Sequence, residues 1–145
     1  MPEAVIVDAI RTPIGRAVKG SLKSVRADDL AAIPLKALIE RNPEVEDSSI
    51  VDIMMGCGYG EGEQGYNVGR MASLIAGLPI EVGACTVNRL CGSSLQAINQ
   101  AAQSIAAGCE DVQIAGGVEH MHHIPMEAGF DASPRLFYRH SPAPP

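Results

Sequence analysis

Short, continuous apolar runs recur along the chain, separated by longer segments in which apolar and polar positions mix. Four of these runs lead into segments rich in glycine or proline, which is typical of short strands buried on both faces. They are Val5–Ile10, Ile50–Met55, Ala84–Val87 and Val112–Ala115.

The segments between these runs have the spacing of amphipathic helices. The first helix is expected from Asp28, where acidic residues favour a helix N-terminus, and it must end by residues 42–43 (Asn-Pro). Pro34 lies inside it and predicts a kink or a late start. Two further helices are expected over residues 67–76 and 92–107. The resulting order, β-α-β-α-β-α-β, predicts a layered α/β fold. The third helix carries one apolar stripe, made of Leu95, Ile98, Ala102 and Ile105.

Composition indicates what fills the core of this fold. The chain has 145 residues, of which 46% are hydrophobic but only 3% are aromatic, so one domain with a core of small aliphatic side chains is expected. Close contacts at glycine suit such a core, because small side chains let helices approach strands. No apolar run approaches the length of a membrane span. The aromatic residues are Tyr59, Tyr66, Phe130, Phe137 and Tyr138.

The formal net charge of −6 argues against nucleic acid or an anionic membrane as the main partner. One local exception is a basic loop, which is either solvated or subunit-facing, or contacts a phosphate. The N-terminus has neither a basic segment nor a long apolar run, so we expect no secretion signal and a cytoplasmic location. The basic loop comprises Arg11, Arg16, Lys19, Lys23 and Arg26.

Two clusters suggest a dinucleotide site and a metal site, but the spacing of their residues argues against both. The glycine run over residues 56–62 follows a strand, but glutamate stands where a dinucleotide fingerprint needs its third glycine. A tight loop that closely approaches other backbone is the better interpretation. His120, His122 and His123 lack the i, i+4 spacing of a helical metal pair and have no Cys or Asp beside them. We expect a polar loop at a strand end there, and no metal.

Cys91 is the sharpest chemical candidate. It stands between a predicted strand and the first turn of a predicted helix, where free N–H groups and the helix dipole stabilise an anion. The same N–H groups could hold an oxyanion after attack on a carbonyl carbon. From the residues alone, Cys91 is either a nucleophile or a small buried side chain. The four cysteines, Cys57, Cys85, Cys91 and Cys109, match no zinc or disulfide-exchange spacing.

Four motifs in order resemble one family. They are VDAIRTPIGR (7–16), GEQGYNVGR (62–70), TVNRLCGSSLQA (86–97) and AGGVEHMHHIPM (115–126). Over some 120 residues the chain resembles the N-terminal half of a thiolase, most of all the 3-ketoacyl-CoA thiolases of fatty-acid β-oxidation. The resemblance implies that Cys91 is the acylated nucleophile. It also implies that Gly116, Gly117 and Glu119 belong to a strand-end segment leading into a loop domain, and that the other cysteines are structural.

The resemblance implies an acyltransferase. Cys91 would attack the 3-keto carbon of a 3-ketoacyl-CoA, acetyl-CoA would leave, and incoming CoA would take the acyl group; the reverse is a Claisen condensation. The implied partners are acyl-CoA and CoA, with CoA as co-substrate and no permanently bound cofactor, and the full-length form would be a homo-oligomer. The decarboxylating ketoacyl synthases share the fold. They usually have Thr-Ala before the cysteine and Ser after it, whereas this chain has Arg89-Leu90 before Cys91 and Gly92 after it.

The sequence also departs from the family. The Gly-His-Pro and Cys-x-Gly motifs that supply the acid and base are absent, and so is much of the loop domain. Residues 1–120 would form the N-terminal domain and residues 121–145 the beginning of a loop domain with a truncated tail. The chain is then an incomplete thiolase, inactive alone. Alternatively it is a non-catalytic remnant, or one piece of a split enzyme whose partner supplies the C-terminal half. Because that half normally covers one face, the helix over 92–107 would be left partly bare.

Overall fold

In the computed structural model, residues 2–124 and 131–136 are described. They form three α-helices, three strands and three short 3-10 turns. The helices are α1 (Ala27–Arg41), α2 (Val68–Ile75) and α3 (Ser93–Ala106), and the strands are β1 (Asp52–Gly56), β2 (Gly83–Val87) and β3 (Gln113–Gly117). The 3-10 turns are Asp47–Ser49, Gly62–Gln64 and Pro134–Leu136.

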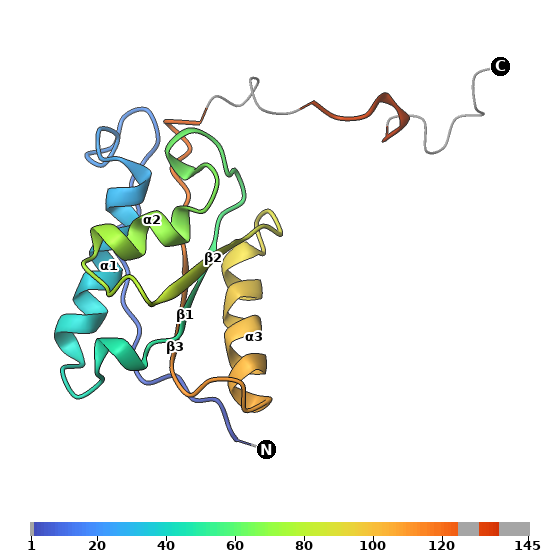
Figure 1. The fold of residues 1–145 in the computed structure, drawn as a ribbon. Coiled ribbons are helices and arrows are strands. Elements are labelled where there is room, and N and C mark those ends of the chain that lie inside the picture. The colour runs from blue at the N-terminus through green and yellow to red at the C-terminus, as the bar shows by residue number, and fades with distance from the viewer. Residues whose placement is uncertain (1, 125–130, 137–145) are drawn as a thin grey trace.

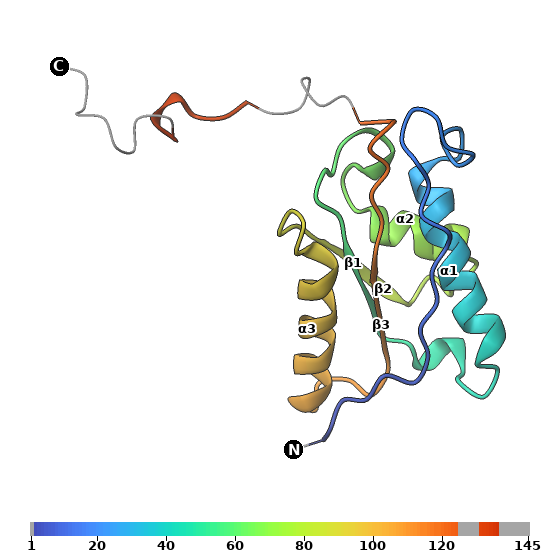
Figure 2. The ribbon, with the colours of Figure 1, turned by 180° about the vertical axis from the view of Figure 1, so that it is seen from behind.

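The strands form a parallel sheet in the order β2-β1-β3. Asp52 of β1 lies opposite Gly83 and Gln113, so the carboxyl ends of all three strands meet at one edge. Figures 1 and 2 show α3 on one face of this sheet and α1 and α2 on the other. Helices on both faces of a parallel sheet are the layered α/β arrangement that the apolar pattern predicted. The loops that follow the strands therefore converge beside the N-terminus of α3.

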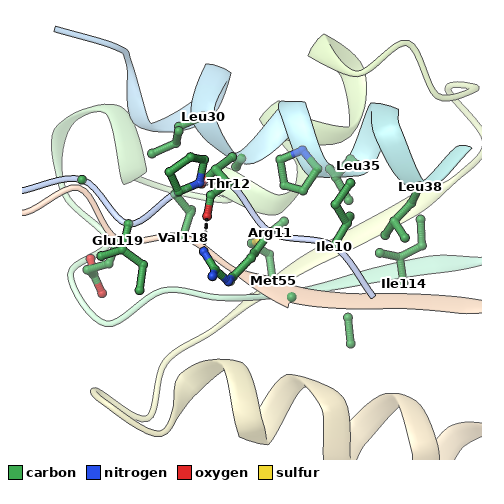
Figure 3. Close-up of a pocket in the computed structure, with 18 residues that line it drawn as sticks. Ile10, Arg11, Thr12, Leu30, Leu35, Leu38, Met55, Ile114, Val118 and Glu119 are labelled. Atoms are coloured by element: carbon green, nitrogen blue, oxygen red, sulfur yellow. Dashed lines mark hydrogen bonds between the residues drawn. The ribbon is translucent and has the colours of Figure 1, made fainter. Parts of the chain in front are cut away.

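The strand predicted at Val5–Ile10 was wrong. The structure gives this segment no strand pairing, and Val5, Ile6 and Val7 are 71%, 79% and 76% exposed. Figure 2 shows the N-terminal segment running beside β3 and α1. A cavity of about 320 Å³ lies between them, lined by residues 10–15, α1 and the segment 114–119 (Figure 3). A ladder needs a neighbouring strand at about 4.8 Å, and across the cavity the apolar run has no such neighbour.

Of the two effects expected from Pro34, a kink or a late start of the first helix, the late start was wrong. The helix begins at Ala27 and continues through Pro34 to Arg41. Its start is held from outside, because a Glu63 carboxylate oxygen accepts the backbone N–H of Ala27 at 2.9 Å. A cap borrowed from a distant loop leaves no signal in the local sequence.

Helix α3 approaches the sheet closely through small residues. Its buried residues are Ser93, Ala97 and Ala101. A Cβ on Gly56 would lie 2.3 Å from the backbone nitrogen of Ser94, and a Cβ on Gly117 would lie 1.9 Å from the Oγ of Ser94. The sheet ends in glycine at these points because nothing larger fits.

The opposite face of α3 carries much of its apolar surface. Leu95 is 64% exposed and Ile98 is 41% exposed. This agrees with the expectation that the helix is partly bare. None of the helices in the described part of the chain is long and apolar enough to cross a membrane.

The core lies between the sheet and the helix pair α1 and α2. Among the residues that the structure describes, it contains no aromatic side chain, in line with the composition. Its buried members are Ala31, Leu35, Ile50, Ile53, Met55, Cys57, Val68, Ala72, Leu78, Val82 and Val118.

Candidate functional site

Cys91 lies in a turn that joins β2 to α3. Three side-chain hydrogen bonds shape this turn. Asn88 Oδ1 accepts the N–H of Leu90 at 2.9 Å, Ser93 Oγ accepts the N–H of Arg89 at 2.9 Å, and the Ser93 hydroxyl donates to the carbonyl of Leu90. Leu90 adopts a positive φ of 49°, which a leucine rarely takes. The turn is therefore held in one conformation by its own polar side chains.

The thiol of Cys91 is exposed and stands just before α3. The N-cap residue is Gly92, which has no side chain to accept a first-turn amide. The backbone N–H groups of Ser94 and Leu95 find no acceptor among the described residues. Unpaired N–H groups and the positive end of the helix dipole favour an anion at this point.

The other thiols lie in different surroundings. Cys57 is buried, and burial together with the Glu119 carboxylate raises its pKa to about 11. Burial and the charge of Asp52 also raise the pKa of Cys85. Cys109 is exposed, but it follows the C-terminal end of α3, where the helix dipole disfavours an anion. Cys91 alone among the four combines exposure with a helix N-terminus.

A buried amide joins the loop after β1 to the end of β3. Gln64 is 1% exposed, and its Nε2 donates to a Glu119 carboxylate oxygen at 2.7 Å and to the carbonyl of Tyr59 at 2.7 Å. Its Oε1 accepts the N–H of His120. The sequence pattern does not single out Gln64 or Asn88. Both lie within the quoted motifs, but neither residue type shows in a sequence that it will bridge two loops.

The histidines lie in the loop that follows β3. His120 is buried with Nε2 3.2 Å from the carbonyl of Leu22, and its ring stacks on His123 with 4.0 Å between ring centroids. His123 Nδ1 lies 2.9 Å from a Glu63 oxygen. Within residues 2–124 and 131–136 no group of His, Cys, Asp and Glu could hold a metal ion. His120 thus connects the segment after β3 to the segment before α1, and His123 connects it to the loop after β1; His122 is exposed, with its ring 5.5 Å from that of His123.

The predicted basic loop is divided. Arg26 pairs with Asp28 at 2.8 Å and with Glu63 at 3.4 Å, so it serves the start of α1. Arg16, Lys19 and Lys23 are exposed. Arg11 lines the cavity of Figure 3, which Cys91 does not reach.

We expect the carboxylates at the start of α1 to make stability sensitive to acid. The Arg26 guanidinium lowers the pKa of Asp28 from its usual value of 3.8. Burial alone would raise the pKa of Glu63, but the hydrogen bonds from His123 and Ala27 outweigh the effect of burial. The pKa of Glu63 is therefore lowered from its usual value of 4.5. A carboxyl group whose folded pKa is depressed stabilises the fold above its unfolded pKa, and this contribution is lost as the pH falls through the folded value. The contribution of these two carboxylates to the free energy of unfolding should thus be present above about pH 4.5 and be lost as the pH falls below that value.

Urea unfolding at a series of pH values checks this. Glu63→Gln should cost about 1 kcal/mol at pH 7 and make the acid loss shallower. The matched control is Glu44→Gln, at an exposed carboxylate outside this cluster. Equal acid loss in both variants would contradict the assignment.

The part of the chain predicted to begin the loop domain is only partly described. Residues 121–124 continue the loop after β3, and Pro134–Leu136 form a 3-10 turn. The aromatic residues of this part, Phe130, Phe137 and Tyr138, lie outside the described residues.

Comparison with known proteins finds the same family as the four motifs. The family model for the thiolase N-terminal domain matches residues 4–142. The 3-ketoacyl-CoA thiolase of Shewanella loihica is 52% identical over 136 residues, which are 94% of this chain and 35% of that protein. The 3-ketoacyl-CoA thiolase of Shewanella denitrificans is 53% identical over 139 residues, which are 96% of this chain and 36% of that protein. The 3-ketoacyl-CoA thiolase of Vibrio vulnificus is 52% identical over 136 residues, which are 94% of this chain and 35% of that protein.

The chain thus spans about a third of the length of these curated relatives. The matched region contains all four motifs and the whole described sheet with its helices. With a family match over nearly the entire sequence, the resemblance found in the motifs is confirmed: the chain belongs to the thiolase family.

Proposed function

We propose that this chain supplies the nucleophile of an acyltransferase that acts on 3-ketoacyl-CoA, and that Cys91 is the residue acylated. The observation that carries the proposal is an exposed cysteine, Cys91, two residues before the start of α3, a helix whose first-turn amides of Ser94 and Leu95 are unpaired among the described residues. The names of the relatives, 3-ketoacyl-CoA thiolases, supply the substrate class.

The proposed reaction balances without any further reagent. The Cys91 thiolate attacks the 3-keto carbon, and the bond between C2 and C3 breaks with its electron pair going to C2. The enolate takes up a proton and becomes acetyl-CoA, while the acyl group stays on the sulfur; the thiol of the incoming CoA loses one proton in turn, so the protons balance. CoA thiolate attacks this thioester and releases the shortened acyl-CoA and the Cys91 thiolate. CoA is thus a co-substrate in our proposal, and no permanent cofactor takes part.

The chain would perform only part of this cycle. A base must activate Cys91 and CoA, and an acid must protonate the enolate. His120 and His123 are engaged with Leu22 and Glu63, so these two histidines are not candidates. We propose that these groups come from the remaining two thirds of a thiolase, which would also cover the bare face of α3. In this view residues 1–120 are the N-terminal domain, residues 121–145 begin the loop domain, and the complete enzyme is a homo-oligomer. The cytoplasmic location stays a prediction from the sequence.

A second candidate function is a subunit of a split enzyme, in which a partner chain supplies the C-terminal half. The exposed stripe of Leu95 and Ile98 favours it over a non-catalytic remnant, because a helix face of this kind suits a permanent partner. The test is co-purification of a second chain that carries the missing acid and base motifs.

Acylation of Cys91 is the direct test of the main proposal. The protein is incubated with acetoacetyl-CoA, and its cysteine peptides are examined by mass spectrometry. We expect the mass of one acetyl group on the peptide that contains Cys91, and none on that peptide in Cys91→Ser. Cys109→Ser is the matched control, since it removes the other exposed thiol and should leave the labelling intact. Labelling at Cys57 or Cys109 in place of Cys91 would overturn the assignment.

A further inference from the structure

Three hydrogen bonds connect the end of β3 to the turn that carries Cys91. A Glu119 carboxylate oxygen accepts the N–H of Gly58 at 2.7 Å. The carbonyl of Gly58 accepts from Asn88 Nδ2 at 2.9 Å. Asn88 Oδ1 in turn accepts the N–H of Leu90 at 2.9 Å, one residue before the thiol. The connection crosses all three loops that follow the carboxyl ends of the strands.

Steric fit reinforces this connection. A Cβ on Gly58 would lie 2.9 Å from Glu119 Oε2 and 3.4 Å from the backbone of Leu90. The backbone at Gly58 therefore fills the space between the carboxylate and the turn. Glu119 stands at one end of the cavity in Figure 3, on the segment that continues β3.

The turn needs such support because it contains a strained residue. The positive φ of Leu90 costs of the order of 1 kcal/mol or more, and it persists only while the surroundings hold it. Asn88 holds the N–H of Leu90, and Ser93 holds its carbonyl. Without Asn88 in place, Leu90 can relax to a negative φ, and the direction of the next residue, Cys91, changes.

The Glu119 carboxylate is fixed firmly enough to act as the anchor. It accepts from the N–H of Tyr59 at 3.3 Å and from Gln64 Nε2 at 2.7 Å, besides Gly58. All these donors are neutral and belong to one loop. The carboxylate thus organises the whole loop after β1, of which Gly58 is the part that contacts Asn88.

We propose that Glu119 is a positioning residue for Cys91, acting through Gly58 and Asn88. It touches neither the thiol nor a substrate in this role. Its effect is to keep Leu90 at positive φ, so that Cys91 keeps its direction in the turn that leads into α3. The proposal deepens the function proposed above and rests on the same cysteine.

The test compares two thiols within one chain. Cys91 and Cys109 are both exposed and lie at opposite ends of α3. Alkylation by iodoacetamide at pH 7 is followed for each by peptide mass spectrometry. In the unaltered chain Cys91 should react about three to ten times faster than Cys109, as expected from the dipole at the two ends of a helix. In Glu119→Gln the ratio should fall toward one, with the rate at Cys109 unchanged.

Two further variants make the test specific. Asn88→Ala breaks the second link and leaves the contacts of Glu119 with Tyr59 and Gln64 in place. It should lower the ratio as Glu119→Gln does, and the double variant should lower it no further, because both changes break one connection. If circular dichroism shows that Glu119→Gln does not fold, Asn88→Ala decides the matter by the same ratio. Glu44→Gln is the control and should leave the ratio unchanged.

The result that would overturn the proposal is a folded Glu119→Gln variant, or a folded Asn88→Ala variant, with the ratio of the unaltered chain. A loss of stability with an unchanged ratio would make Glu119 a purely structural clamp. Alkylation does not require acyl transfer, so failure of Cys91 to accept an acetyl group would reject the proposed function and leave this test intact.

Discussion

Replacing Gly56 by alanine is expected to lower the free energy of unfolding by about 3 kcal/mol, at the upper end of the cost of overpacking. The added Cβ would lie 2.3 Å from the backbone nitrogen of Ser94 and 2.5 Å from the carbonyl carbon of Ser93. Both atoms belong to the backbone of α3, so no side-chain rotation can relieve the contact. The helix must move away from the sheet, and Cys91 must move with it.

Gly116→Ala is the matched control for this substitution. Gly116 lies in β3, and a Cβ there would meet nothing within 4 Å. Its replacement should change stability by less than about 0.5 kcal/mol. Urea unfolding followed by circular dichroism measures both variants. Equal losses would mean that the sheet tolerates no added methyl group anywhere, and that the approach of α3 is not the cause.

The second large effect concerns turnover. Supplied with acetoacetyl-CoA and CoA, the chain of 145 residues should take up at most one acetyl group per molecule and show no sustained thiolysis. Acyl transfer needs a base for CoA and an acid for the enolate, and general acid–base groups contribute about 10²- to 10⁴-fold each. No titratable side chain in the described structure forms a hydrogen bond with the sulfur of Cys91.

The formation of acetyl-CoA beyond one equivalent per chain measures this directly. Cys91→Ser provides the background rate. Sustained turnover that Cys91→Ser abolishes would contradict the proposed requirement for the other two thirds of a thiolase. Mixing the chain with the C-terminal part of a related thiolase is the complementary arm, and recovery of turnover there would support the split-enzyme alternative.

Much of the layered fold could be predicted from the pattern of apolar residues. Strands β1, β2 and β3 and helices α2 and α3 each lie within two residues of their expected ends, because each forms by burying a continuous run or a stripe. The run Val5–Ile10 shows the limit of that reasoning. Its composition is that of a strand, but pairing depends on a neighbour that a sequence pattern does not locate.

Part of the candidate site could likewise be predicted from the sequence, and part could not. The motif around Cys91 indicated a turn before a helix, and the structure has that turn. The connection from Glu119 through Gly58 to Asn88 could not be predicted, because it joins residues 61 and 30 positions apart by single hydrogen bonds. Long-range polar contacts of this kind leave no periodicity in the sequence.

The central position of β1 has a consequence for the order in which the chain folds. Its partners lie far along the sequence, with Asp52 opposite Gly83 and Gln113, so every sheet contact is non-local. Chains with such contacts fold slowly, because a long loop must close before pairing stabilises it. During synthesis, α1, α2 and β1 are made first, and their apolar faces stay uncovered until the chain has been made as far as Gly117, the end of β3. The late arrival of β3 makes this interval the stage at which newly made chains are most open to aggregation.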